Sequence, residues 1–159
     1  MDRGADLVRS VRRARQGSPS VLPEGSAAAE NLQIASRIVA GELSGRRGKW
    51  DDAIRSVQEA VSLEEAIPYN EPPVWHHPPR QVLGALLLEA GRPADAERVY
   101  RADLERFREN GWSLFGLMNS LEAQGRSDEA AIIRQRFQRA WARADITLSS
   151  SRVLAVAGD

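Results

Sequence analysis

The sequence contains no cysteine and a single lysine, and each scarcity removes a class of chemistry. Without cysteine the 159-residue chain cannot form a disulfide framework, use a thiol nucleophile or bind a metal through thiolates. The only lysine, Lys49, lies in no glycine-rich phosphate-binding loop. The other basic side chains are arginines, which do not gather on one expected helix face. Nucleotide-binding and thiol-dependent functions are therefore not expected.

Long apolar runs and net charge are missing as well. No stretch approaches the run of about 18 apolar residues that a membrane span requires. Residues 1–20 lack the apolar core of a secretory signal, so we expect a cytoplasmic protein without membrane contact. The 22 basic and 22 acidic side chains cancel, so no overall field attracts nucleic acid. With 42% apolar residues, the composition is that of one ordinary globular domain.

Catalytic and metal-binding motifs are also absent. No serine lies in a catalytic glycine–serine turn, because Gly-Glu-Leu-Ser-Gly at 41–45 falls at an expected helix end. His76 and His77 are the only histidines, and adjacent residues do not share a helix face. Ordinary loop packing is favoured over a metal site. We therefore expect a protein that is not an enzyme and has no metal or other cofactor.

The sequence does contain an internal repeat. Three segments read glycine, basic residue, two variable positions, acidic residue, alanine, and they begin at Gly48, Gly91 and Gly125. The last two glycines are 34 residues apart, whereas the first two are 43 apart. The nine additional residues fit the stretch 67–79, which is rich in proline and aromatic residues. A period of 34 with one insertion accounts for all three segments.

Each position of the repeat has a structural reason. Glycine just past a helix takes the left-handed conformation that ends it. An acidic residue in the first turn of the next helix complements its positive end, and the alanine lets the two helices of a hairpin approach closely. We expect six helices in three antiparallel hairpins, about 27–66, 79–108 and 111–143, and no sheet.

This pattern resembles the tetratricopeptide repeat family over residues 32–143. The middle repeat is nearest to the family pattern, with Gly84 at the small first-helix position and Tyr100 at the second-helix aromatic position. The outer repeats depart from it, as end repeats do. The last repeat and Glu-Pro-Pro-Val-Trp at 71–75 look like bacterial tetratricopeptide-containing proteins. The resemblance implies an all-α fold of antiparallel helical hairpins stacked as a short right-handed superhelix.

Three regions follow from this reading. Residues 1–25 form a flexible or partly helical N-terminal segment, and residues 26–145 form the repeat domain with its long loop at 67–79. Residues 146–159 form a C-terminal tail. The tail begins with polar and β-branched residues that do not extend a helix, so it either folds back over the last repeat or is disordered.

The resemblance implies a non-catalytic scaffold or adaptor that binds a protein or peptide in a concave groove lined by the first helix of each hairpin. Trp112 and Phe115 are three residues apart on one helix face, where they either anchor an apolar side chain of the partner or pack against a neighbouring hairpin or the long loop. Family members that grip a terminal carboxylate use lysine, arginine and asparagine at set groove positions. In this sequence those positions carry Ile38, Val39, Glu42, Trp112 and Gly116. A carboxylate clamp is therefore not expected. The candidate binding residues are Ile38, Glu42, Gln81, Ala85, Glu89, Trp112, Phe115, Asn119 and Glu122, with Trp75 in the long loop.

Other functions stay open at this stage. The chain could be a small metal-binding or enzymatic accessory protein that uses the His76–His77 loop. It could also be a helical repeat that binds nucleic acid, although zero net charge and an acidic groove oppose this. A homodimer is compatible with the large end faces that three hairpins expose.

Overall fold

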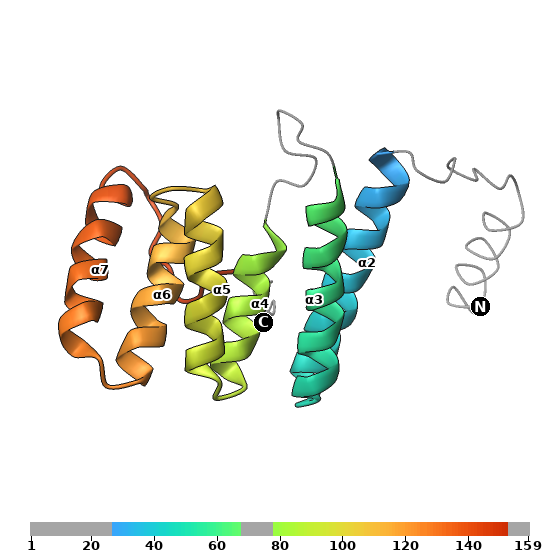
Figure 1. Ribbon diagram of the computed structural model, residues 1–159, viewed down its shortest axis with the longest axis horizontal. Coiled ribbons are helices and arrows are strands. Elements are labelled where there is room, and N and C mark those ends of the chain that lie inside the picture. Colours follow the sequence, from blue (N-terminus) through green and yellow to red (C-terminus); the bar gives the residue numbers. More distant parts are fainter. Residues whose placement is uncertain (1–26, 68–77, 153–159) are drawn as a thin grey trace, which may run out of the picture.

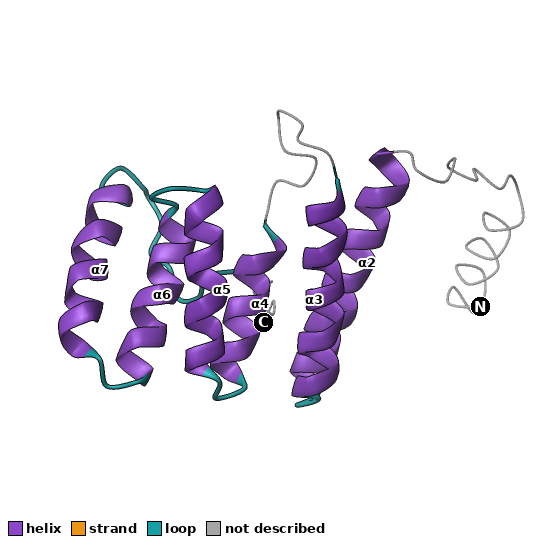
Figure 2. Ribbon diagram, viewed as in Figure 1, coloured by secondary structure: helices purple, strands orange, loops and turns teal. Residues whose placement is uncertain are grey.

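The computed structural model describes residues 27–67 and 78–152 and places six helices and no strand in that part of the chain (Figures 1 and 2). The predicted all-α fold with six helices is confirmed for these residues. Consecutive helices pair as α2–α3, α4–α5 and α6–α7. The helices are α2 (Ala27–Arg46), α3 (Trp50–Ala66), α4 (Pro79–Glu89), α5 (Pro93–Arg106), α6 (Gly111–Ala123) and α7 (Ser127–Ala140).

The turns inside the three hairpins are built in the same way. Their glycines, Gly48, Gly91 and Gly125, have φ angles of +70°, +71° and +73°, which a residue without a Cβ adopts at little cost. The amide after each glycine donates to the carbonyl five residues earlier, at distances of 2.8 to 3.0 Å. This is the hydrogen bond of a Schellman helix end. The repeated sequence signal therefore corresponds to one repeated turn.

The first helices of the hairpins lie closer together than the second helices do. The backbones of α2 and α4, and of α4 and α6, lie close together, whereas no such backbone proximity joins α3, α5 and α7 within the described residues. Long side chains bridge these second helices, in the ion pairs Arg106–Glu64 and Arg101–Glu129. We call the side formed by α2, α4 and α6 the inner face. Figure 1 shows the helices following one another across the molecule in chain order.

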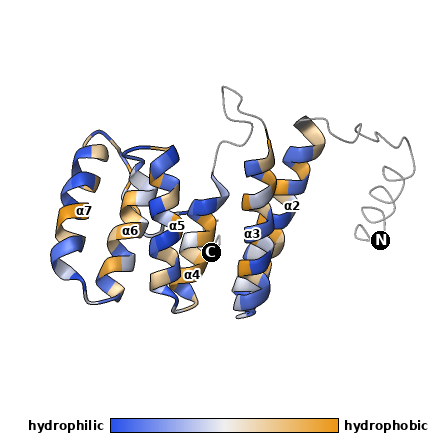
Figure 3. Ribbon diagram, viewed as in Figure 1, coloured by the Kyte–Doolittle hydropathy of each residue, from blue (hydrophilic) through white to orange (hydrophobic). Residues whose placement is uncertain are grey.

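The contacts of each helix explain its composition. The backbone of α4 lies next to α2, α3, α5 and α6, and that of α6 lies next to α4, α5 and α7, whereas the backbone of α7 lies next to α6 alone among the described helices. A helix that is covered on several sides needs apolar residues around most of its circumference. Accordingly, α4 and α6 carry more orange in the hydropathy view than α5, which is largely blue, whereas blue and orange bands alternate along α7 (Figure 3). The core lies between α4, α5 and α6, with contributions from α3 and α7.

Tyr100 of α5 fills the narrowest place in this core. Its side chain is fully buried, and its ring lies against Gly84 of α4 and Gly116 of α6. A Cβ added to Gly84 would lie 2.6 Å from Tyr100 Cε1, and a Cβ added to Gly116 would lie 2.6 Å from Cε2. Both distances are well below carbon–carbon contact. Glycine at these two positions makes room for the aromatic ring.

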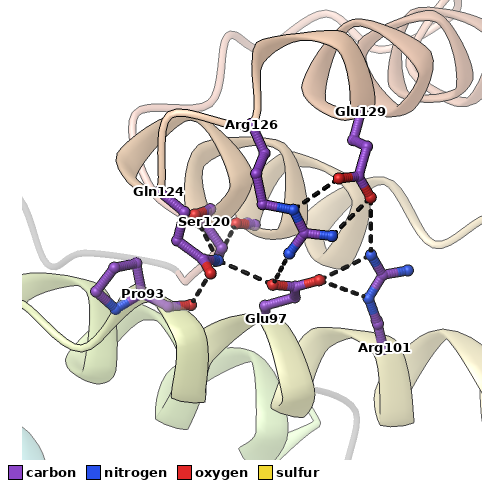
Figure 4. Close-up of polar contacts among 8 residues, drawn as sticks. Pro93, Glu97, Arg101, Ser120, Gln124, Arg126 and Glu129 are labelled. Atoms are coloured by element: carbon purple, nitrogen blue, oxygen red, sulfur yellow. Dashed lines mark hydrogen bonds and ion pairs between the residues drawn. The ribbon is translucent and has the colours of Figure 1, made fainter.

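A polar network joins the second hairpin to the third (Figure 4). Glu97 of α5 accepts hydrogen bonds from Gln124 at 2.9 Å, Arg126 at 2.6 Å and Arg101 at 2.8 Å. Burial opposes ionisation of this carboxylate, but the three hydrogen bonds outweigh it and hold the Glu97 pKa below its usual range. Glu129 of α7 pairs with Arg126 at 2.6 Å and lies 4.0 Å from Arg101 of α5. Together with the bonds to Glu97, these charge-assisted contacts hold the two hairpins together.

Candidate functional site

The inner face is crossed by the chain's own C-terminal segment. After α7, the Trp141 indole donates to the Ile146 carbonyl at 2.8 Å. Figure 1 shows the trace running from the end of α7 past α6 to α4. Leu148, Ser151 and Arg152 are buried there. Of the two possibilities left open for the tail, residues 146–152 fold back, and they extend beyond the last hairpin as far as α4 and α2. Residues 153–159 lie outside the described part of the chain.

Arg152 joins two helices through its guanidinium. Its Nη1 donates to Glu42 Oε1 of α2 at 3.0 Å, and its Nη2 donates to the two carboxylate oxygens of Glu89 of α4 at 2.8 and 2.9 Å. The Arg152 side chain is only 7% exposed. A buried guanidinium needs charged partners to offset its desolvation, and the two carboxylates supply them. Both glutamates were predicted groove residues, and the structure brings them together around this one cation.

Ser151 forms the neighbouring contact of the segment. Its hydroxyl donates to the Gln81 carbonyl at 3.2 Å and lies 2.5 Å from the Tyr100 hydroxyl. Burial raises the pKa of Tyr100, which keeps the phenol protonated so that it can donate to Ser151. Tyr100 starts on α5 and reaches the inner face between α4 and α6. The segment is therefore in contact with side chains or carbonyls from α2, α4 and α5.

A second layer of polar groups lies beneath Gln81. The Gln81 amide donates to Asp103 Oδ2 at 3.3 Å and to Asn110 Oδ1 at 3.2 Å, and Ser113 donates to the same Asp103 oxygen at 2.5 Å. Asp103 is fully buried, and this burial raises its pKa although the two hydrogen bonds oppose the shift. Asn110 also caps α6 by accepting from the Ser113 amide. The layer fixes the position of α4 relative to the α5–α6 turn.

The predicted aromatic anchors of α6 contact α7. Trp112 meets Trp141 edge to face with ring centroids 5.7 Å apart, and Phe115 lies 5.5 Å from Phe137. Trp141 in turn stacks on Phe137 at 5.8 Å, and its ring lies over Gly111. The rings thus pack within their own hairpin, an arrangement that neither of the two sequence alternatives named. A ligand-binding role for them stays a prediction.

The remaining predicted residues have varied surroundings. Ile38 is half-buried against the core and Ala85 is buried within it. Glu122 pairs with Arg134 of α7, and Asn119 is half-buried. Trp75, His76 and His77 lie outside the described residues. Within residues 27–67 and 78–152, no group of three or more metal-binding side chains comes together.

Sequence reasoning did not single out Ser151, Arg152 or the Tyr100 hydroxyl as members of the site. Tyr100 was recognised for its ring, as a packing residue. The sequence offered one signal for this site. Two acidic groove positions are followed, later in the chain, by a tail that contains an arginine. That signal gives complementary charge but no geometry, because Glu89 and Arg152 are 63 positions apart in the chain and many placements are possible.

A separate groove of about 860 Å³ lies between α2 and α3. Leu32, at its edge, is 61% exposed, and Arg37 pairs with Glu59 across it at 3.1 Å. Nothing in the described part of the chain covers this groove, which lies at the end of the molecule formed by the first hairpin. The groove is lined by Leu32, Gln33, Ser36, Arg37, Arg55, Gln58, Glu59, Ser62 and Leu63.

None of the described helices has the length and apolar character needed to cross a membrane. Neither models of protein families nor curated proteins give a match to the chain.

Proposed function

We propose that the chain is a non-catalytic repeat protein of the tetratricopeptide type that binds an extended segment of a partner protein along its inner face. The proposal includes a short right-handed superhelix with α2, α4 and α6 on its concave side. The equivalent turns after Gly48, Gly91 and Gly125 and the contacts among first helices support this arrangement. The protein would act in the cytoplasm as a scaffold or adaptor.

One observation carries the proposal. The inner face already accommodates an extended segment, residues 146–152, and provides separate contacts for its arginine and its serine. A surface that holds one extended segment through side chains of several helices is suited to hold another. The face contributes two carboxylates, Glu42 and Glu89, which favour a basic protein segment over the phosphates of nucleic acid.

Binding rather than chemistry is favoured by the polar groups near this face. Asp103 accepts hydrogen bonds from Ser113 and Gln81, and both donors belong to the framework that positions α4 and α6. A hydroxyl that is hydrogen-bonded and fully buried, as Ser113 is, is not accessible to a substrate. These groups are therefore assigned a structural role in the proposal.

Site-directed crosslinking tests the proposal, because a cysteine-free chain allows one photoreactive label at a chosen position. The label is attached through Val39→Cys, an exposed position of α2 one turn before Glu42, or, as the matched control, through Glu105→Cys on the exposed side of α5. Both labels leave Glu42 and Glu89 in place. Extracts of the source cell are then irradiated with each labelled protein. We expect a specific protein to crosslink from position 39 and not from position 105, at a site that mass spectrometry locates within an extended segment. Equal crosslinking from both positions, or none from position 39, would contradict the proposal.

A further inference from the structure

The contacts of the C-terminal segment indicate what kind of partner the inner face accepts. Building on the proposed function, we propose that the face recognises an arginine side chain on an extended segment, and that residues 148–152 are a built-in occupant that the partner must displace. The partner is thus a protein segment that presents an arginine in the same way as Arg152. The chain would regulate its own binding through competition between the two.

The geometry around Arg152 is specific for a guanidinium. Two nitrogens of its planar fork contact two carboxylates that belong to different helices, Glu42 on α2 and Glu89 on α4. A lysine ammonium is one compact charge and cannot reproduce the divergent donors of the fork. When the segment leaves, the two carboxylates keep their positions on the helices without a cation between them. The emptied site therefore attracts another arginine.

The segment also shows a spacing that a partner would share. Leu148, Ser151 and Arg152 are buried, whereas Ser149 is exposed and Ser150 is half-buried. Ser151 occupies the place where the Tyr100 hydroxyl and the Gln81 carbonyl meet. The site is therefore complementary to an apolar residue, two spacer residues, a small hydroxyl residue and an arginine. The hydroxyl adds orientation, and the arginine supplies the charge.

The way in which the segment is attached makes it displaceable. Among the described residues, none from 145 to 152 takes part in a backbone–backbone hydrogen bond, so side chains hold the segment in place. The preceding stretch, residues 142–147, is exposed and can act as a hinge without unfolding α7. A segment tethered in this way has an effective concentration in the millimolar range, so it competes with a partner but does not exclude one of higher affinity.

A peptide titration of the full-length protein tests both parts of the proposal. The probe is the acetylated and amidated peptide Ile-Thr-Leu-Ser-Ser-Ser-Arg, which copies residues 146–152, and binding is followed by amide chemical shifts of 15N-labelled protein. Arg152→Gln should bind the probe at least about tenfold more tightly than the wild type, because the competing arginine is gone. Arg143→Gln, which removes an exposed arginine, should behave like the wild type. A probe ending in glutamine should bind Arg152→Gln at least about tenfold more weakly than the arginine probe.

Each contrary result affects a defined part of the reasoning. Equal affinity of Arg152→Gln and the wild type for the probe would show that residues 148–152 do not compete, and would overturn the built-in occupant. Equal affinity for the arginine and glutamine probes would overturn arginine recognition and leave the proposed function standing. The proposed function fails separately, in the crosslinking experiment.

Glu42 and Glu89 retain 25% and 40% side-chain exposure, so water can hydrate them and Arg152→Gln should fold. If circular dichroism shows otherwise, excess arginine probe is added to the wild type instead. The amides of residues 148–152 must then shift, and unchanged amides would overturn the displacement.

Discussion

Gly84→Ala adds a single methyl group at the narrowest place in the core, and two effects of opposite sign compete. Alanine is favoured over glycine in a helix interior by about 0.5–1 kcal/mol, so an uncrowded site would gain stability. At Gly84 the new Cβ would lie 2.6 Å from Tyr100 Cε1, about 1 Å inside normal carbon contact. The ring is fully buried and also lies against Gly116, so it has little room to move.

Overpacking of this kind costs about 1–3 kcal/mol, and it outweighs the gain in helix propensity. We therefore expect Gly84→Ala to lower the free energy of unfolding by about 1 kcal/mol, the difference between the midpoints of the two ranges. Urea unfolding monitored by circular dichroism measures this change. The slope of the transition should stay constant if both proteins unfold in two states.

The same substitution in a Tyr100→Leu background provides the control. Leucine does not fill the space between the two glycines as the ring does, so the added methyl group should then stabilise by up to about 0.5–1 kcal/mol. The effect of Gly84→Ala thus changes sign between the two backgrounds, and the coupling energy is the difference. An unchanged or increased stability of Gly84→Ala in the wild type would refute the reasoning that glycine is required beside Tyr100.

Three further substitutions test the packing and the buried carboxylate. Ala96→Leu should destabilise the protein by about 1–3 kcal/mol, because Ala96 is fully buried. The control Ala94→Leu, at an exposed position, should change stability by no more than about 0.5 kcal/mol. Thermal melting of the two variants compares them. Trp112→Ala should cost about 2–4 kcal/mol in urea unfolding, somewhat below the loss for a fully buried aromatic residue, because Trp112 is half-buried against Trp141. Burial raises the pKa of Asp103 in the folded protein, so the wild type loses stability as the pH rises from about 4, the ordinary pKa of an aspartate, through this raised pKa. Asp103→Asn cannot ionise and should therefore gain stability relative to the wild type over that pH range. A difference in free energy of unfolding that does not change with pH would contradict this prediction.

The sequence was sufficient to predict the parts of the fold that depend on local rules. Gly91 and its equivalents end helices because the left-handed conformation is a property of glycine, and Ala96 marks a close helix approach because only a small side chain fits there. Trp112 and Phe115 could not be assigned, because three-residue spacing places two rings on one helix face without saying what lies opposite. Phe137 and Trp141 of the same hairpin lie opposite them.

The placement of the C-terminal segment lies beyond local rules. Residues 146–152 have no periodic pattern, and their position depends on Arg152 meeting Glu42, which is 110 residues away in the chain. Asp103 interrupts the apolar face of α5, and the sequence offers no reason for it. The structure shows that it accepts hydrogen bonds from Gln81 and Ser113, which come from two other helices. Such long-range polar contacts are specific to the assembled hairpins.

Paramagnetic relaxation in the full-length protein tests most directly whether the inner face holds a displaceable segment. A nitroxide is attached through Ser149→Cys, an exposed position in the segment, and compared with one attached through Gln138→Cys on α7. The label at position 149 is expected to broaden the amide signals of α4 around Gln81, and an excess of the arginine probe is expected to restore them. The label at position 138 should leave these α4 signals unaffected by the probe. Sharp α4 signals with the label at position 149, or broadening that the probe does not relieve, would contradict the account.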